Sequence, residues 1–215
     1  MTDPDRLAFY DSPEGAEEYL DEYRKLHRKL SDRRERRILQ RYFARMDGVR
    51  SVLDLPCGWG RYLPTLRSAG AWVLEADAST SMLKTTRRLH DPKPDVVRCF
   101  GHEVPLADDA VDLVFSMRLN HHLVDPEVRR GHVRELFRVA RRFAVFTYFD
   151  AASLKNRLRV LRTRLGLTRK TPKNTLRRAE VRALARDAGW RVVADPMLFV
   201  VGSGHRLVLA EPADA

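Results

Sequence analysis

Residues 52–62, with the sequence V-L-D-L-P-C-G-W-G-R-Y, constrain the fold of this chain more than any other segment. A short apolar run contains the acidic residue Asp54, a turn with two glycines follows, and an apolar pattern resumes at Tyr62. This order predicts a strand, a ligand-binding loop and the start of a helix. In open α/β sheets, ligands bind at the carboxyl ends of the strands, where glycines in the first turn let backbone amides approach a bound molecule closely.

A second acidic residue, Asp77, follows the next apolar run, residues 71–76. An acid at the end of the second strand of such a sheet commonly accepts hydrogen bonds from ribose hydroxyls. The two acids therefore predict a nucleoside-containing cofactor that is bound across the ends of two neighbouring strands.

The glycine spacing argues against the dinucleotide fingerprint G-x-G-x-x-G, because Leu63 occupies the position of the third glycine. The segment D-L-P-C-G-W-G-R instead resembles motif I of the class I S-adenosylmethionine-dependent methyltransferases. The cofactor of that family has no phosphate, but the carboxylate of its amino acid end suits backbone amides at a helix start. The resemblance implies that Asp54 lies near the amino acid end and that Asp77 binds the ribose. It also implies that the turn binds the cofactor through Pro56, Cys57, Gly58 and Gly60.

The resemblance extends in order over residues 50–150. Residues 76–83 look like the family's D-x-S-x-x-M-L, which places Ala78 after the ribose acid and Met82 against the adenine. Residues 105–114 look like the segment that leads into the fourth strand, residues 120–123 match the L-H-H-L beyond it, and Met117 between them is a further cofactor-binding candidate. The chain is therefore similar to the methyltransferase-domain family, and broadly to the group that includes the ubiquinone and menaquinone C-methyltransferases.

Two positions depart from the family pattern. Many relatives have an Asp-Ala pair beside the adenine, where this chain has Phe100 and Gly101. We expect the adenine to stack on Phe100 and to contact the backbone near Gly101 or His102 instead. The usual leucine before the two histidines is Asn120 here, which makes this polar residue a candidate for the substrate pocket.

Length and composition predict one well-buried domain, since the chain has 215 residues of which 44% are apolar. No apolar run approaches the roughly 18 residues needed to cross a bilayer, and the first residues lack a signal-peptide pattern, so we expect a cytoplasmic protein. Cys57 and Cys99 are the two cysteines, which predicts neither a disulfide framework nor a metal site.

Short apolar runs alternate with helical stretches along the chain. We expect strands near residues 51–55, 71–76, 95–99, 111–117 and 143–149, and helices near 60–69, 79–90, 126–140 and 177–189. This alternation predicts an α/β fold with a Rossmann-like, doubly wound, seven-stranded and mostly parallel sheet. Residues 191–194 and 205–210 suit a terminal hairpin with an antiparallel last strand, and the apolar spacing in residues 14–46 predicts N-terminal helices. Asp125 followed by Pro126 is typical of a helix start.

We expect one methyltransferase domain over residues 1–215. Its parts are the N-terminal helices (1–48), a cofactor-binding core (49–150), a basic helical lid or insertion (151–176), and a C-terminal helix and hairpin (177–215).

The positive charge is concentrated in residues 151–182, which contain eleven Lys and Arg against one acid, a balance of +10 within a formal net charge of +11. Leucines recur there at helical spacing, which predicts an amphipathic basic helix over residues 151–166. Its natural partners are anions: an acidic substrate that Arg157 contacts, an anionic membrane surface, or RNA. An alternative is that the charges only solvate the surface.

Methyl transfer from a sulfonium is an in-line displacement, so most of the catalytic work is to position the acceptor and exclude water. An acceptor that must lose a proton needs a base, and a histidine titrates in the right range. His121 and His122 lie where the family's substrate pocket opens, with His121 as the first choice, although the pair also fits a purely structural role. Further pocket candidates are Arg118, Asn120 and Tyr148.

Three functional hypotheses follow from the sequence. The leading one is S-adenosylmethionine-dependent methyl transfer to a small-molecule or lipid-intermediate acceptor that carries an anionic group. The second is an RNA methyltransferase that uses the basic segment, although the chain has no N/D-P-P-Y motif and no evident RNA-binding module. The third is a non-catalytic protein that binds S-adenosylmethionine.

Overall fold

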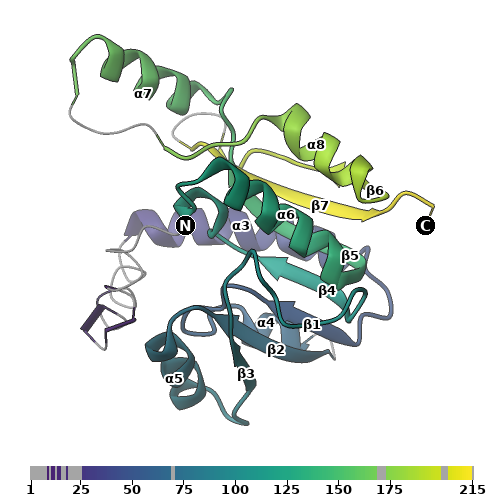
Figure 1. The fold of residues 1–215 in the computed structure, drawn as a ribbon. Coiled ribbons are helices and arrows are strands. Elements are labelled where there is room, and N and C mark those ends of the chain that lie inside the picture. The colour runs from purple at the N-terminus through teal and green to yellow at the C-terminus, as the bar shows by residue number, and fades with distance from the viewer. Residues whose placement is uncertain are drawn as a thin grey trace.

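The structure is a computed structural model that describes residues 26–68, 71–168, 173–199 and 203–214, together with six positions before residue 26. These ranges form a seven-stranded sheet and six α-helices (Figure 1). The six earlier positions are Phe9, Asp11, Ser12, Glu14, Gly15 and Glu18. The first of the expected N-terminal helices falls on residues outside the described ranges.

The sheet has the strand order β3-β2-β1-β4-β5-β7-β6. Neighbouring strands from β3 to β5 pair in parallel, whereas β7 is antiparallel to both β5 and β6. The strands are β1 (Ser51–Asp54), β2 (Trp72–Asp77), β3 (Asp95–Arg98), β4 (Val111–Ser116), β5 (Ala140–Phe149), β6 (Trp190–Ala194) and β7 (His205–Pro212). The expected α/β fold with an antiparallel last strand is confirmed.

Helices cover both faces of this sheet. They are α3 (Leu26–Phe43), α4 (Leu63–Ser68), α5 (Thr80–Leu89), α6 (Pro126–Val139), α7 (Leu154–Arg164) and α8 (Arg178–Asp187), with a short 3-10 turn, η1 (Asn120–His122), after β4. One apolar core lies between the sheet and helices α6 and α8, and the other lies between the sheet and helices α3 and α4. Because both faces are covered, all six residues of the central strand β4 are buried.

The start of α6 follows the sequence expectation. Asp125 is the N-cap, its Oδ1 accepts a hydrogen bond from the Glu127 N–H at 2.8 Å, and Pro126 occupies the first turn. Proline fits there because the first amides of a helix have no partner within the helix.

Some boundaries differ from the expectation. Strand β5 begins at Ala140 rather than near residue 143, because Ala140 pairs with Val111 of β4 before a shift in register between the two strands. The charged Arg141 and Arg142 interrupt the apolar pattern by which the start of the strand would be predicted. Arg141 forms an ion pair with Asp112 of the neighbouring strand at 2.5 Å. Helix α4 begins at Leu63 rather than at residue 60, because the residues just before it form the turn that contains Gly58 and Gly60.

Helix α7 projects away from the body of the molecule (Figure 1). The chain leaves the sheet after β5 and returns at Leu176, whose N–H donates to the Phe149 carbonyl at 2.9 Å. The Ala151 N–H donates to the Leu176 carbonyl at 3.0 Å, which joins the two ends of the excursion. The basic helix expected over residues 151–166 thus forms over Leu154–Arg164. No helix in the described part of the chain is long and apolar enough to span a membrane.

Candidate functional site

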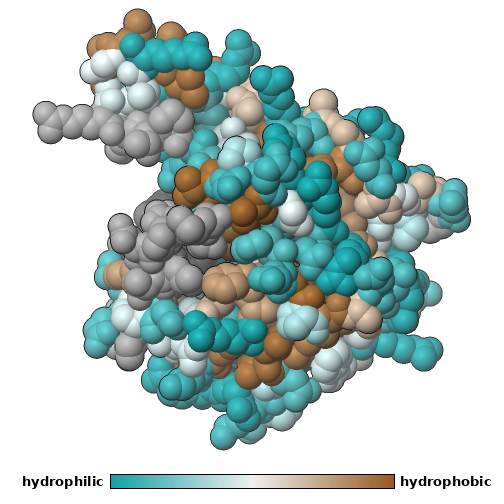
Figure 2. Space-filling model, in the orientation of Figure 1, coloured by the Kyte–Doolittle hydropathy of each residue, from teal (hydrophilic) through white to brown (hydrophobic). Residues whose placement is uncertain are grey.

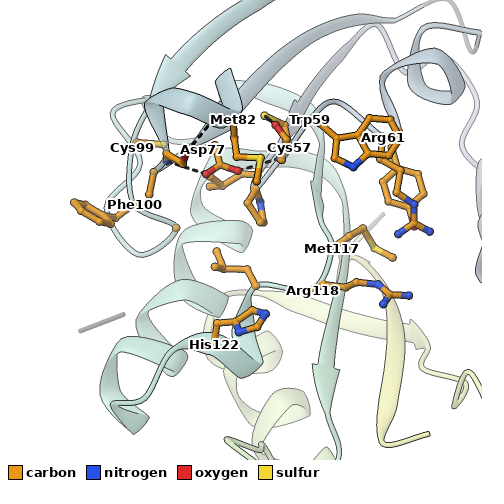
Figure 3. A pocket seen from close by; sticks show the side chains of 18 of the residues that line it. Cys57, Trp59, Arg61, Asp77, Met82, Cys99, Phe100, Met117, Arg118 and His122 are labelled. Atoms are coloured by element: carbon orange, nitrogen blue, oxygen red, sulfur yellow. Dashed lines mark hydrogen bonds between the residues drawn. The ribbon is translucent and has the colours of Figure 1, made fainter. Parts of the chain in front are cut away.

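A pocket opens beyond the carboxyl ends of strands β1, β2 and β4, at the place that the sequence predicts for a cofactor (Figure 3). It brings together residues from the glycine turn, the end of β2, the start of α5, the segment after β3 and the segment after β4. The sequence-predicted residues that line it are Pro56, Cys57, Gly58, Asp77, Ala78, Met82, Phe100, Gly101, Met117, Arg118 and His122.

Several further residues line the pocket that the sequence reasoning did not select. They are Leu55, Trp59, Arg61, Tyr62, Ser79, Cys99, Leu119 and Leu123. Their position in the sequence could have indicated them, because each lies within two positions of a sequence-predicted site residue. Trp59, for example, separates the two glycines of the turn.

The glycine turn wraps around the end of β2. The Cys57 N–H donates to the Ala76 carbonyl at 2.8 Å, and the Gly58 N–H donates to Asp77 Oδ2 at 2.9 Å. Gly60 does not line the pocket, but it has a φ of +75°, and a Cβ there would lie 2.8 Å from a Thr86 methyl group and 2.7 Å from His90 Nε2. Glycine is therefore required at position 60 so that the turn can pack on α5.

Asp77 is held by backbone amides on both of its carboxylate oxygens. Oδ2 accepts from Gly58, and Oδ1 accepts from the Ser79 N–H at 2.9 Å. Burial raises the pKa of Asp77 to about 6, while the backbone amides of Ser79 and Gly58 act in the opposite direction. Each oxygen has a second lone pair, so the carboxylate can still accept hydrogen bonds from a ligand's hydroxyl groups.

Asp54 lies behind the glycine turn rather than on the pocket surface. It is 1% exposed and stands beside Glu75 in the parallel pairing of β1 and β2. No described residue donates a hydrogen bond to either of its carboxylate oxygens. Burial, followed by the nearby Glu75 and Asp77 carboxylates, raises the pKa of Asp54, and burial raises that of Glu75 to about 7. Three acids thus gather beneath and beside the turn, which favours a ligand with a positive charge there.

Phe100 and Gly101 form the edge of the pocket that follows β3 (Figure 3). The buried His132 of α6 holds this edge, since its Nδ1 lies 2.7 Å from the Gly101 carbonyl and its Nε2 lies 3.2 Å from Ser116 Oγ. Burial lowers the pKa of His132 to about 4, so the ring is neutral, with Nδ1–H donating to the carbonyl. His102 lies outside the pocket lining, and its ring centroid is 5.9 Å from that of Phe100.

Arg118 enters the pocket from the segment after β4 and connects it to helix α3. Its backbone has a φ of +65°, a strained conformation for a residue with a side chain, and its N–H donates to Thr147 Oγ1 at 2.7 Å. Its guanidinium lies 2.5 Å from Glu35 Oε2, and Tyr62 donates to Glu35 Oε1, also at 2.5 Å. Burial alone would raise the pKa of Glu35, but Arg118 and Arg61 outweigh it and hold this pKa below its usual value.

The two predicted histidines occupy different positions. His122 lines the pocket, whereas His121 lies behind it, with ring centroids 4.5 Å from Phe149 and 5.1 Å from His205. The two histidine rings are 4.0 Å apart. Burial, with His122 and His205 nearby, lowers the pKa of His121 well below its ordinary value, so its ring is neutral at physiological pH. The geometry thus favours His122 over the sequence's first choice, His121, as the group that meets a ligand.

The remaining substrate candidates lie outside the pocket lining. Asn120 is buried, and its Nδ2 donates to the Arg129 carbonyl at 3.1 Å. Tyr148 is fully buried in the core between the sheet and helices α6 and α8. Arg157 is exposed on the projecting α7. Asn120 and Tyr148 are withdrawn from the pocket because they belong to the packed interior. Among the described residues, no group of three His, Cys, Asp or Glu side chains is arranged to hold a metal ion.

Comparison with known proteins identifies the domain. The family model described as "Methyltransferase domain" matches residues 53–147, which include the end of β1, all of β2 and β4, and the loops that form the pocket. Over these residues, the chain matches a methyltransferase domain. Residues 54–62, 77–82 and 117–122 of this methyltransferase domain supply most of the pocket lining.

Solved structures show the same fold as the methyltransferase domain. Magnesium protoporphyrin IX methyltransferase from Synechocystis, solved with bound SAH, has a TM-score of 0.70 and 18% identity, covering 87% of this chain and 88% of that chain. A protein from Pyrococcus horikoshii has a TM-score of 0.67 and 18% identity, covering 89% and 94% of the two chains.

A sequence relative is an uncharacterized 37.1 kDa protein in transposon TN4556 of Streptomyces fradiae, which is 33% identical over 93 residues. This match covers 41% of the present chain and spans 27% of the length of the relative.

Proposed function

We propose that this protein transfers a methyl group from S-adenosylmethionine to a small-molecule or lipid-intermediate acceptor that carries an anionic group. The observation that carries the proposal is the pocket between the glycine turn and Asp77, which lies within the residues that match the methyltransferase family. A structural relative that was solved with bound SAH supports the same cofactor for this chain.

The chemistry of the pocket fits this cofactor. Asp77 has acceptor capacity for the ribose hydroxyls, and the side chains of Met82 and Phe100 offer apolar contacts for the adenine. The buried Asp54 carboxylate, without a donor among the described residues, lies behind the turn and attracts the positive charges of the amino acid end. A dinucleotide would instead require a site for two phosphates, and here three acids gather around the turn.

The bound cofactor supplies an electrophilic methyl group on a sulfonium, and no covalent bond to the protein is needed. The protein's own residues orient the acceptor in line with that methyl and exclude water. Met117, Leu119 and Leu123 line the pocket after β4 and form an apolar wall on the acceptor side. Such a wall keeps water from competing with the acceptor.

His122 is the proposed general base for an acceptor that must lose a proton. It lines the pocket on the β4 side, where Met117 and Arg118 also lie (Figure 3). His121 packs behind it and positions its ring. Replacing His122 by Asn is expected to lower turnover without weakening cofactor binding, whereas His121→Asn is expected to change turnover less.

Two guanidinium groups, those of Arg61 and Arg118, support an anionic acceptor because both line the pocket. Arg118 is fixed by its ion pair with Glu35, and Arg61 by its ion pair with Asp32. A planar guanidinium held in this way suits a carboxylate or phosphate group.

The first test is cofactor binding by isothermal titration calorimetry. The protein is expected to bind S-adenosylmethionine and its demethylated product, and Asp77→Asn is expected to weaken both by at least tenfold, the loss of one or two hydrogen bonds to a charged group. The thermal unfolding midpoint of the variant checks that the turn still forms. Absence of binding by the wild-type protein would refute the proposed cofactor.

The second test identifies the acceptor class. The protein is incubated with cofactor labelled in its methyl group and a cell extract that has been separated into metabolites, lipids and RNA. Label in metabolites or lipids supports the proposal, whereas label in RNA supports the alternative of an RNA methyltransferase. Tight cofactor binding with no label in any fraction supports the alternative of a non-catalytic binding protein. His122→Asn serves as the control for enzyme-dependent labelling.

A further inference from the structure

Helix α7 is amphipathic, and it is turned with its apolar side away from the protein. Its one buried side chain is Asn156, whose Nδ2 donates to the Asp150 carbonyl at 2.8 Å. A surface helix normally packs its apolar stripe on the core and presents its polar side to water. Here the polar side faces the body, so the apolar stripe faces outward.

The outward stripe consists of leucines that recur at helical spacing. Their exposed fractions are 54% for Leu154, 47% for Leu158, 51% for Leu161 and 61% for Leu165, and Leu167 just beyond the helix is 65% exposed. With 3.6 residues per turn, the first four fall on one side of the helix. Figure 2 shows apolar side chains beside hydrophilic ones on this projecting part of the molecule. Isolated exposed leucines are ordinary, but a continuous stripe indicates a binding surface.

Cations flank this stripe on both sides. By the same helical spacing, Arg157 and Arg164 lie along one edge, and Lys155 and Arg162 lie along the other. Helix α7 contains no acidic residue. Within the described ranges of the chain, no salt bridge joins Arg157, Arg162 or Arg164 to a carboxylate, so these charges remain available to an external anion.

We propose that α7 is a docking helix for an anionic lipid surface, with its leucines inserted among the acyl chains and its arginines on the headgroups. A leucine stripe between two rows of cations is the arrangement of interfacial amphipathic helices. RNA would be bound by the cations but offers no site for a row of leucines. A second copy of α7 would bring two strongly basic helices together, which their like charges oppose.

The base of the excursion connects this surface to the pocket. Asn174, on the returning segment, donates from Nδ2 to the His121 carbonyl at 3.1 Å, and the His121 ring lies against that of the pocket residue His122. Docking of α7 would therefore hold the acceptor side of the pocket near the lipid surface. The docking inference itself does not depend on methyl transfer, because it concerns binding alone.

The test is cosedimentation of the full chain with phosphatidylglycerol vesicles and, separately, with phosphatidylcholine vesicles. We expect binding to the anionic vesicles that weakens as salt rises, and little binding to the neutral ones. The double variant L158Q/L161Q is expected to lose most of the binding. Arg157→Gln and Arg162→Gln are each expected to weaken it about fivefold, the change that corresponds to about 1 kcal/mol per cation near an anionic surface.

Matched controls come from helix α5. Leu89 is 47% exposed, the same as Leu158, and Arg88 is exposed beside it, so Leu89→Gln and Arg88→Gln are expected to leave vesicle binding unchanged. The proposal is overturned by equal binding to both kinds of vesicle, or by full binding of L158Q/L161Q. It is also overturned if the protein self-associates through these leucines in sedimentation experiments, or if RNA is the anion whose binding depends on them.

Discussion

The ionised carboxylate of Asp54 lowers the stability of the cofactor-free protein. It is 1% exposed, it has no hydrogen-bond donor among the described residues, and it stands beside Glu75. Burying a charge without a partner costs several kcal/mol, so the group takes up a proton more readily than usual. Buried acids of this kind gather at functional sites, where a ligand supplies the missing charge or donor.

Replacing Asp54 by Asn therefore has opposite effects on stability and on cofactor binding. At pH 7.5 we expect the cofactor-free variant to gain about 1 kcal/mol of unfolding free energy, or about 2–4 °C in its unfolding midpoint for a chain of this size. Its affinity for S-adenosylmethionine is expected to fall at least tenfold. Calorimetry measures both quantities. Asp47→Asn, at an exposed position, is the control; a less stable D54N variant with unchanged affinity would contradict this account of Asp54.

Gly101 provides a second test at the scale of single atoms. A Cβ at this position would lie 2.4 Å from Leu119 Cδ2 and 3.0 Å from the Nδ1 atom of His132. Leu119 would have to move within the pocket that it lines, so Gly101→Ala is expected to weaken cofactor binding and to cost about 1–3 kcal/mol of stability.

The control for Gly101→Ala is Gly131→Ala, because the nearest atom to a Cβ at position 131 is 3.9 Å away. Gly131 lies inside helix α6, where alanine is favoured over glycine by about 1 kcal/mol. Thermal unfolding is expected to show a gain for Gly131→Ala and a loss for Gly101→Ala. Unchanged cofactor affinity in Gly101→Ala would mean that Leu119 can move at no cost to the pocket.

At the scale of elements, the sequence predicted the central strands because a parallel sheet covered on both faces requires uninterrupted apolar runs. It misplaced the start of β5, because Arg141 and Arg142 interrupt the apolar pattern in the first residues of the strand. The glycine turn was predictable from local spacing. The contact of Glu35 with Arg118 was not predictable, because it joins residues 83 positions apart. In addition, α3 carries Glu35 among four arginines, a pattern that is typical of a solvated surface.

Helix α3 is attached to the pocket through Glu35, which is fully buried and contacts Arg118 and Tyr62. Removing one partner of a buried ion pair leaves the other charge uncompensated. Glu35→Gln is therefore expected to lose about 3 kcal/mol of unfolding free energy at neutral pH. Because the pKa of Glu35 is lowered in the folded protein, the wild type loses this contribution only as the pH falls below the ordinary range of a glutamate.

Glu127→Gln is the matched control for Glu35→Gln. Glu127 also pairs with an arginine, Arg130, but its side chain is 73% exposed, so we expect a change of at most about 1 kcal/mol. Denaturant unfolding at pH 7 and pH 4 compares the two variants with the wild type. Equal losses in both variants would show that the Glu35 contact does not anchor α3.

At the scale of the whole molecule, the charges are separated by sign. The basic excess lies in residues 151–182, around the projecting α7, while Asp54, Glu75 and Asp77 gather at the glycine turn. The side of the pocket at the glycine turn is thus locally acidic in a chain with a formal net charge of +11. The negative charge at the turn attracts a cofactor with a sulfonium and an ammonium group, and the positive charge on α7 attracts an anionic partner.

This separation predicts that cofactor affinity rises with pH. In the free protein, burial raises the pKa of Asp77 to about 6 and that of Glu75 to about 7, so part of this acid group is protonated below neutral pH. A cationic ligand binds best when the acids are ionised, and it must therefore release protons on binding. Measurements of stability against pH would not separate the effect of these acids from that of other groups. The raised pKa values of the acids make stability fall as the pH rises, whereas the lowered pKa values of His121 and His132 make it rise over an overlapping pH range.

Calorimetric titrations from pH 5 to pH 8 therefore test the whole charge arrangement. We expect the affinity for S-adenosylmethionine to increase about tenfold or more over this interval, one unit of pKa shift being worth about 1.4 kcal/mol. S-adenosylhomocysteine lacks the sulfonium charge, so its affinity is expected to change less. Titrations in buffers of different ionisation enthalpy count the protons released, and proton uptake, or an equal pH dependence for the two ligands, would contradict an acidic cofactor site.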